Sequence, residues 1–160
     1  MGLKKWQIVA IAVACAGVTT WLGVRLLTTD RQRVERVIRR LTGRIEARDA
    51  GGFCLLLTED YSDNSGSSRA ALRASLSRVL PQLGSASIRI EDLEVEVSGE
   101  TARADFLASC VATARRHGRQ PPWRWETRVR LELRKHEGEW RVRKAAYRLP
   151  PIARRALGRP

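Results

Sequence analysis

WRWETRVRLELRKHEGEWRVRKAAY, residues 123–147, is the stretch that decides the fold of this chain. From Trp123 to Arg134 apolar and charged side chains alternate, which is typical of a β-strand with one buried and one solvated face. The turn His136–Glu139 then reverses the chain into another strand, Trp140–Tyr147. We therefore expect a hairpin at the end of a larger antiparallel sheet.

Two further strands are expected before this hairpin. Ile88–Val97 alternates, but its phase slips at Glu91–Asp92, which predicts a β-bulge. A turn at Ser98–Glu100 leads into a second alternating run, Ala102–Cys110. The four strands together predict one apolar face and one charged face. The apolar face is expected to hold Val95, Val97, Phe106, Trp123, Trp125, Val129, Leu131, Trp140 and Val142.

Helical patterns come before the strands. Apolar residues recur at helical spacing over Thr29–Asp49, and Gly51 and Gly52 then interrupt the pattern. Phe53–Leu57 predicts a short helical segment, and the composition of Thr58–Ser68 predicts a loop. Ser68 can cap a further helix that Pro81 ends. Helices followed by an antiparallel sheet predict an α+β fold in which the helices cover the apolar face.

The N-terminal end has a different composition. Trp6–Val24 contains no charged residue and would span about 28 Å as a helix, close to the hydrocarbon thickness of a bilayer. Lys4, Lys5 and Arg25 flank this run, so residues 1–28 are expected to form a transmembrane anchor with a short basic tail. A cleaved signal peptide and a lipoprotein signal at Cys15 are the alternatives. The single-pass anchor is favoured because the apolar run continues to Leu27.

The orientation of this anchor is left open by the charges. Lys4 and Lys5 favour a cytoplasmic N-terminus and an exported domain, whereas the arginines from Arg25 to Arg40 favour a cytoplasmic domain. Several of those arginines belong to the predicted amphipathic helix, which weakens their influence on topology. We therefore favour an extracytoplasmic domain.

The net charge is +13, and 26 of the 30 basic residues are arginine. Such a charge attracts anionic lipid, phosphate or nucleic acid. Residues 149–160 form a basic tail rich in proline and arginine. Nucleic acid is not expected, because no exposed aromatic platform accompanies the charge. The candidate arginines for an anionic surface are Arg115, Arg116, Arg119, Arg154 and Arg155.

IEARDAGGFCLLLTEDYSD, residues 45–63, and HEGEWRVRKAAYR, residues 136–148, resemble the nuclear transport factor 2-like superfamily. This superfamily includes ketosteroid isomerases and polyketide cyclases, and the resemblance covers residues 29–148. It implies a cone in which a curved antiparallel sheet wraps around helices and a pocket opens at one end. Many members of the superfamily dimerise through the sheet, so the resemblance also implies a possible homodimer.

Members with isomerase activity place a carboxylate base and a tyrosine inside the pocket. In this sequence Asp60 and Tyr61 are the nearest candidates, while Asp105 falls on the charged face. Two histidines, His117 and His136, lie in charged turns, and neither has metal-ligand spacing with a cysteine. A bridge between Cys54 and Cys110 is open as an alternative to two free thiols. No cofactor or metal site is expected.

The leading functional hypothesis is a membrane-anchored, non-catalytic domain. It would bind a small apolar ligand or a protein partner, as an accessory component of an envelope assembly. The alternatives are an isomerase or cyclase that uses Asp60 and Tyr61, and an electrostatic binder of anionic lipid. The candidate ligand-pocket residues are Phe106, Trp123, Trp125 and Trp140.

Overall fold

The computed structural model describes residues 29–115 and 122–148. A long helix covers residues 29–46 and is followed by the short helix α2 (Ala50–Leu55). The strand β1 (Leu57–Asp63), the helix α3 (Arg69–Val79) and the 3-10 turn η1 (Leu80–Gln82) come next. The remaining strands are β2 (Leu83–Ser98), β3 (Thr101–Ala114), β4 (Trp123–His136) and β5 (Glu139–Tyr147).

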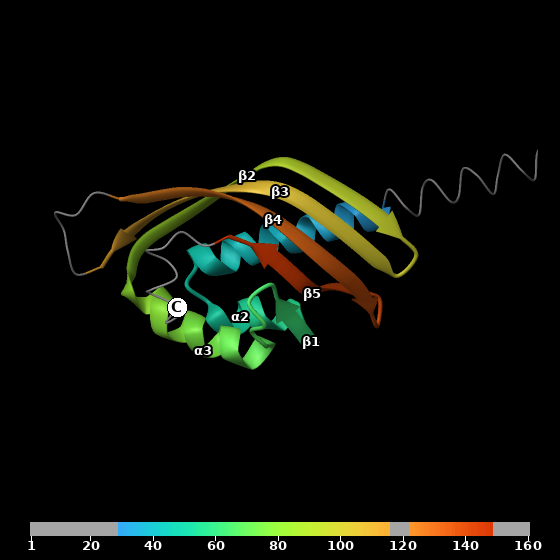
Figure 1. The fold of residues 1–160 in the computed structure, drawn as a ribbon, viewed down its shortest axis with the longest axis horizontal. Helices are drawn as coiled ribbons and strands as arrows, with labels where there is room; N and C mark the ends of the chain where they lie inside the picture. Colours follow the sequence, from blue (N-terminus) through green and yellow to red (C-terminus); the bar gives the residue numbers. More distant parts are fainter. Residues whose placement is uncertain (1–28, 116–121, 149–160) are drawn as a thin grey trace, which may run out of the picture.

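The strands of the described residues form one five-stranded sheet in the order β1-β5-β4-β3-β2. The neighbours from β5 to β2 are antiparallel, whereas β1 runs parallel to β5. Figure 1 shows the long strands curving over the first helix, with α2 and α3 beside β1. The predicted α+β fold, with helices packed on a curved sheet, is confirmed.

The core lies between the first helix and the concave face of the sheet. Val34 and Ile38 of that helix are almost completely buried, as are Leu133 and Val142 of the sheet. The buried residues of β3 lie at alternate positions on the face that meets the helices, and most of them are small: Ala102, Ala104, Phe106, Ala108 and Ala112. The alternation in Ala102–Cys110 predicts this arrangement, because successive side chains of a strand point to opposite faces of the sheet.

The segment Thr58–Ser68 differs from the prediction. It was expected to be a loop, but its first part belongs to β1, which pairs with β5 at the edge of the sheet. Leu57, Tyr61 and Asp63 point into the protein, while Glu59 and Asp60 are exposed. The strand forms by pairing with a parallel strand more than eighty residues away in the sequence. The amino-acid composition of a short segment does not indicate such a distant partner.

The bulge predicted at Glu91–Asp92 is present. The pairing of β2 with β3 shifts register between Glu91 and Glu94, and Asp92 has a positive φ of 52°. A second irregularity was not predicted: the pairing of β5 with β4 shifts between Val142 and Lys144. This shift moves Ala145 and Tyr147 onto the concave face, although simple alternation from Trp140 would place them outside.

Three predictions concern residues outside the described part of the chain. These are the anchor in residues 1–28, part of the loop after Arg115, and the basic tail in residues 149–160. Among the helices of residues 29–115 and 122–148, none is both long and apolar enough to cross a bilayer.

Candidate functional site

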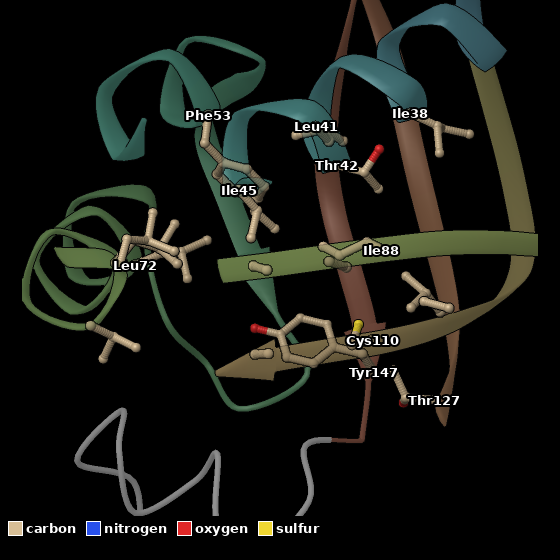
Figure 2. Close-up of a pocket in the computed structure, with 18 of the residues that line it drawn as sticks. Ile38, Leu41, Thr42, Ile45, Phe53, Leu72, Ile88, Cys110, Thr127 and Tyr147 are labelled. Carbon is tan, nitrogen blue, oxygen red and sulfur yellow. The ribbon is translucent and has the colours of Figure 1, made fainter. Parts of the chain in front are cut away.

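A cavity of about 430 Å³ lies between the concave face of the sheet, the first helix and α3. Its walls come from every element of the domain, and Figure 2 shows Ile38 and Leu41 of the first helix facing Ile88 of β2 and Leu72 of α3 across this space. Ligand pockets in proteins usually measure about 300–1,000 Å³, so the volume suits a small organic molecule.

The lining is almost entirely hydrocarbon. Among the described residues that form the cavity wall, none is Asp, Glu, His, Lys or Arg. The apolar lining residues are supplied mainly by Leu, Ile, Val, Ala, Phe and Trp. The polar lining groups are the side chains of Thr42, Tyr61, Ser87, Cys110, Thr127 and Tyr147.

Phe106, Trp123 and Trp125, all predicted to line a ligand pocket, line this cavity. Phe106 is buried in the middle of β3, whereas the two tryptophans stand half-buried at the start of β4. Trp140 is buried but is absent from the cavity wall. Its indole packs instead at the other end of the first helix.

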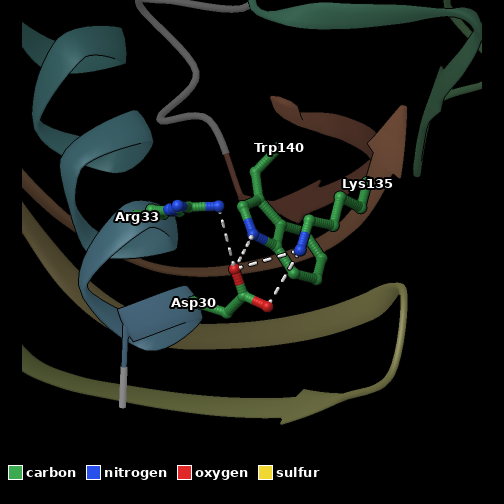
Figure 3. Close-up of polar contacts among 4 residues, drawn as sticks. All are labelled: Asp30, Arg33, Lys135 and Trp140. Carbon is green, nitrogen blue, oxygen red and sulfur yellow. Dashed lines mark hydrogen bonds and ion pairs between the residues drawn. The ribbon is translucent and has the colours of Figure 1, made fainter. Parts of the chain in front are cut away.

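At that end Trp140 belongs to a polar cluster around Asp30 (Figure 3). The Trp140 Nε1 group donates to Asp30 Oδ1 at 3.3 Å, and Lys135 Nζ lies 3.0 Å from Asp30 Oδ2. Arg33 Nη1 is 3.6 Å from the same carboxylate. Burial alone would raise the pKa of Asp30, but the hydrogen bonds from Lys135 and Trp140 and the two cations lower it below its ordinary value. The cluster joins the first helix to the β4–β5 hairpin.

The two predicted catalytic residues lie on opposite sides of β1. Tyr61 is 4% exposed and lines the cavity. The side chain of Asp60 is exposed, and its Oδ2 accepts a hydrogen bond from Arg143 Nε at 2.9 Å. Hydrogen bonds from Thr58 and Arg143 lower the pKa of Asp60. Asp60 is therefore an ionised surface carboxylate, and the pairing of these two residues in one pocket is wrong because adjacent strand residues face opposite ways.

A different carboxylate lies beside the cavity. The hydroxyl of Tyr147, a lining residue, donates to Oδ2 of Asp63 at 2.9 Å. Asp63 is only 7% exposed, and its Oδ1 accepts from Ser65 N, Ser65 Oγ and Ser67 N at 2.6–2.9 Å. This pair was not predicted, because Asp63 falls in the segment that was expected to be a loop. Tyr147 could have been found only by predicting the bulge in β5.

Two cysteines lie in the described part of the chain, and both are free. Cys110 lines the cavity, and burial raises the pKa of its thiol to about 11. Cys54 is buried in α2 outside the cavity wall, and burial raises its pKa as well. The bridge between them, left open by the sequence, is not formed.

Of the predicted anion-binding arginines, only Arg115 is described; it is exposed, and its backbone N–H donates to Gln82 O at 2.9 Å. The other four, Arg116, Arg119, Arg154 and Arg155, lie outside the described residues. Within residues 29–115 and 122–148, no group of three or more His, Cys, Asp or Glu side chains is arranged to hold a metal ion.

The SnoaL-like domain family matches residues 28–146. The chain belongs to this family. The match runs from the first helix into β5 and includes every lining residue of the cavity except Tyr147. The predicted membership of the nuclear transport factor 2-like superfamily is confirmed. None of the curated proteins compared with the sequence matches it.

Solved structures show the same fold at low identity. A candidate scytalone dehydratase from Novosphingobium aromaticivorans has a TM-score of 0.70 and 15% identity, over 76% of this chain and 84% of that protein. A nuclear transport factor 2-like protein from Salmonella enterica has a TM-score of 0.67 and 16% identity, with 77% and 92% covered. Another, with a cystatin-like fold, from Novosphingobium aromaticivorans has 23% identity and a TM-score of 0.62, with 86% and 95% covered. At these identities the similarity describes the SnoaL-like fold alone.

Proposed function

We propose that this SnoaL-like domain binds a small, predominantly apolar molecule in the cavity, and that it does so close to a membrane. The observation that carries the proposal is the cavity itself: about 430 Å³, lined by hydrocarbon and by no ionisable carboxylate, imidazole, ammonium or guanidinium group of the described residues. Transfer of apolar surface from water to such a wall is favourable by about 25 cal/mol per Å².

The size of the space supports a ligand-binding role. Protein interiors normally pack as densely as organic crystals, with few voids larger than a water molecule. This space is partly open to solvent, so water can enter it. An apolar molecule that binds there displaces water from hydrocarbon walls, which is the favourable step of hydrophobic binding.

Binding can be measured through Cys110, because its thiol lies in the cavity wall. The full-length protein is titrated with 2-methoxynaphthalene while the modification of Cys110 by N-ethylmaleimide is followed by peptide mass spectrometry. We expect saturable protection of Cys110. The free probe concentration is corrected for partitioning into empty detergent micelles.

Two neighbouring substitutions on β3 provide a matched control. Ala108→Phe fills the cavity, because Ala108 is a buried lining residue, and it is expected to abolish the protection. Ser109→Phe adds the same side chain on the opposite face and is expected to leave the protection intact. Absence of protection in the unsubstituted protein, or equal protection in both variants, contradicts the proposal.

Membrane attachment rests on the sequence of residues 6–24 and is the second part of the proposal. The anchor would hold the domain at the lipid surface, where apolar molecules are concentrated. The basic residues Arg115, Arg116, Arg119, Arg154 and Arg155 would favour anionic lipid. Dimerisation, or a partner in an envelope assembly, is compatible with the same arrangement.

A second candidate function is proton transfer of the isomerase or cyclase type. The observation that favours it is the Tyr147–Asp63 hydrogen bond at the cavity wall, together with similarity to a candidate scytalone dehydratase. An enzyme of this type would accelerate exchange of the acidic C–H of 2-tetralone in D₂O, as followed by proton NMR. Exchange above the buffer rate that Tyr147→Phe removes supports this function, and exchange at the buffer rate contradicts it.

A further inference from the structure

We propose that the outer face of the first helix lies flat against anionic lipid headgroups and holds the domain to the bilayer through arginines. This inference rests on the membrane attachment in the proposed function and adds the surface by which the domain meets the lipid. The exposed arginines of this face are called the arginine stripe: Arg33, Arg36, Arg39, Arg40 and Arg44.

The arginine stripe lies opposite the buried face of the helix. Val34 and Ile38 face the sheet and are almost completely buried. With about 3.6 residues per turn, Arg36 and Arg40 project from the other side, and the whole stripe extends about 16 Å along the helix axis. The other exposed residues on this side carry no charge: Gln32, Gly43 and Ala47.

Three arginines of the stripe have no acidic partner. Arg36, Arg39 and Arg40 form no ion pair with any residue of the described part of the chain, whereas the arginines at the two ends of the stripe each have one acidic neighbour. Glu35 pairs with another arginine of the same helix, and Glu46 accepts a hydrogen bond from a backbone N–H group of β2. The helix therefore presents three uncompensated guanidinium groups on its exposed face.

The spacing of these arginines makes an anionic partner favourable. Arg36 lies three residues before Arg39 and four before Arg40, so like charges are neighbours on the helix surface, which destabilises a helix. An anionic surface offsets this repulsion. A guanidinium group also matches phosphate oxygens with two parallel N–H donors. Lipid headgroups present phosphates in a plane, which suits side chains that share one face of a helix.

The position of the helix in the chain favours lipid over other polyanions. The helix begins at residue 29, directly after the expected anchor of residues 1–28. If the helix stood upright on the bilayer, Arg44 would lie about 22 Å above the helix start. This height is well beyond the Debye length of about 8 Å at physiological ionic strength. Only a helix that lies along the surface brings the whole arginine stripe to the headgroups.

This orientation also places the cavity near the lipid. Thr42 and Ile45, which line the cavity, belong to the half of the helix that is distant from the expected anchor. An upright helix would hold that half away from the membrane, whereas the docked helix holds it beside the headgroups. Apolar molecules dissolved in the bilayer then have a short path to the cavity.

The test measures which backbone amides of the full-length protein come close to the headgroups. The protein, isotope-labelled at glycine, is placed in nanodiscs that contain a lipid with a gadolinium-chelating headgroup, which broadens nearby NMR signals. Gly43 reports on the arginine stripe. Gly138 lies in the β4–β5 turn, at the anchor end of the helix, where Lys135 contacts Asp30. With phosphatidylglycerol present we expect Gly43 to broaden more than Gly138, and with phosphatidylcholine alone we expect the opposite order.

Two triple variants that remove the same charge assign the docking to its surface. The stripe variant is Arg36→Gln, Arg39→Gln and Arg40→Gln. We expect it to weaken docking by about a hundredfold, so that Gly43 no longer broadens more than Gly138. Salt at about 1 M, where the Debye length is about 3 Å, should have the same effect. The control variant replaces three exposed arginines on the outer face of the sheet and should keep the order of the unsubstituted protein: Arg89→Gln, Arg124→Gln and Arg128→Gln.

The outcomes separate this inference from the proposed function. Broadening of Gly138 but not of Gly43 in phosphatidylglycerol nanodiscs overturns the docking and leaves the anchor standing. An equal effect of both triple variants also overturns it, because net charge rather than the arginine stripe would then act. Loss of the Gly43 broadening when duplex DNA is added would assign the stripe to nucleic acid and overturn the lipid assignment. Broadening of no glycine contradicts both the docking and the membrane attachment.

Discussion

A hydrogen bond between Tyr147 and Asp63 joins β5, the last strand along the chain, to β1, the first. The Tyr147 hydroxyl donates to Asp63 Oδ2 at 2.9 Å, and the two residues sit on β5 and β1, which are parallel neighbours. The same contact places a phenol oxygen at the wall of an apolar cavity and a carboxylate just behind it. A contact that links two strands of the sheet therefore also forms part of the cavity wall.

The first prediction concerns the stability that Asp63 provides. Asp63→Ala leaves the N–H groups of Ser65 and Ser67 without their acceptor, and we expect it to lower the free energy of unfolding by about 2–4 kcal/mol. Urea unfolding of the purified protein measures the change. Asp60→Ala is the control on the same strand: its ion pair with Arg143 is exposed, so the loss should be much smaller than that of Asp63→Ala. Equal losses in both variants would contradict this role of Asp63.

The second prediction concerns the pH dependence of the Asp30 cluster. The pKa of Asp30 is lowered in the folded protein, so its ionisation stabilises the fold above the ordinary carboxyl value of 3.8, and this contribution is lost as the pH falls through the folded pKa. We therefore expect Asp30→Asn to destabilise the protein at pH 7 by more than it does at pH 3. Thermal unfolding at both values measures the difference.

Glu35→Gln is the matched control for Asp30, because Glu35 forms an ion pair with Arg31 on the surface of the same helix. Its effect on stability should stay within about 0.5 kcal/mol at either pH. A destabilisation by Asp30→Asn that is the same at pH 7 and pH 3 would show that the charge of Asp30 does not act through the cluster.

The third prediction concerns the reactivity of Cys110. The thiolate is the form that attacks N-ethylmaleimide, and burial raises the pKa of Cys110 to about 11. Its modification should therefore accelerate about tenfold for each pH unit between 7 and 9, without reaching a plateau. Peptide mass spectrometry separates Cys110 from Cys54. A rate that levels off near pH 8.5 would indicate an ordinary exposed thiol.

The fourth prediction concerns the N-terminal segment. We expect the full-length protein to remain in the membrane fraction after carbonate extraction, and a variant that lacks residues 1–28 to be released. A full-length protein found in the carbonate supernatant would contradict the anchor. A reporter fused to the C-terminus, active on only one side of the membrane, then tests the favoured extracytoplasmic orientation.

The sequence predicts the sheet well and its edge poorly. Alternation from Trp123 to Arg134 and from Ala102 to Cys110 placed Phe106, Trp123 and Trp125 on the concave face, because period-2 patterns depend only on neighbouring residues. The strand β1 was missed because residues 57–63 carry exposed acidic side chains and pair with a distant strand. The local pattern of Glu59, Asp60 and Ser62 is that of a loop.

The apolar lining of the candidate site was predicted from the sequence, whereas its polar residues Asp63 and Tyr147 were not. The apolar character of the interior follows from strand parity, and the described cavity wall is mainly hydrocarbon, although Tyr61, Cys110 and Tyr147 also line it. Asp63 was not a candidate, because Thr58–Ser68 was predicted to be a loop, for which strand parity has no meaning. Tyr147 was missed because one bulge residue in β5 reverses the faces of the residues after it.

The most direct test of ligand binding in the cavity is an NMR measurement of where the probe sits. Intermolecular nuclear Overhauser effects between 2-methoxynaphthalene and the methyl groups of the full-length protein report contacts shorter than about 5 Å. The account predicts contacts to Ile38, Leu72 and Leu131, which line the cavity from the first helix, α3 and β4. Contacts confined to Leu55, an apolar side chain that is 67% exposed on the outside of α2, would contradict it.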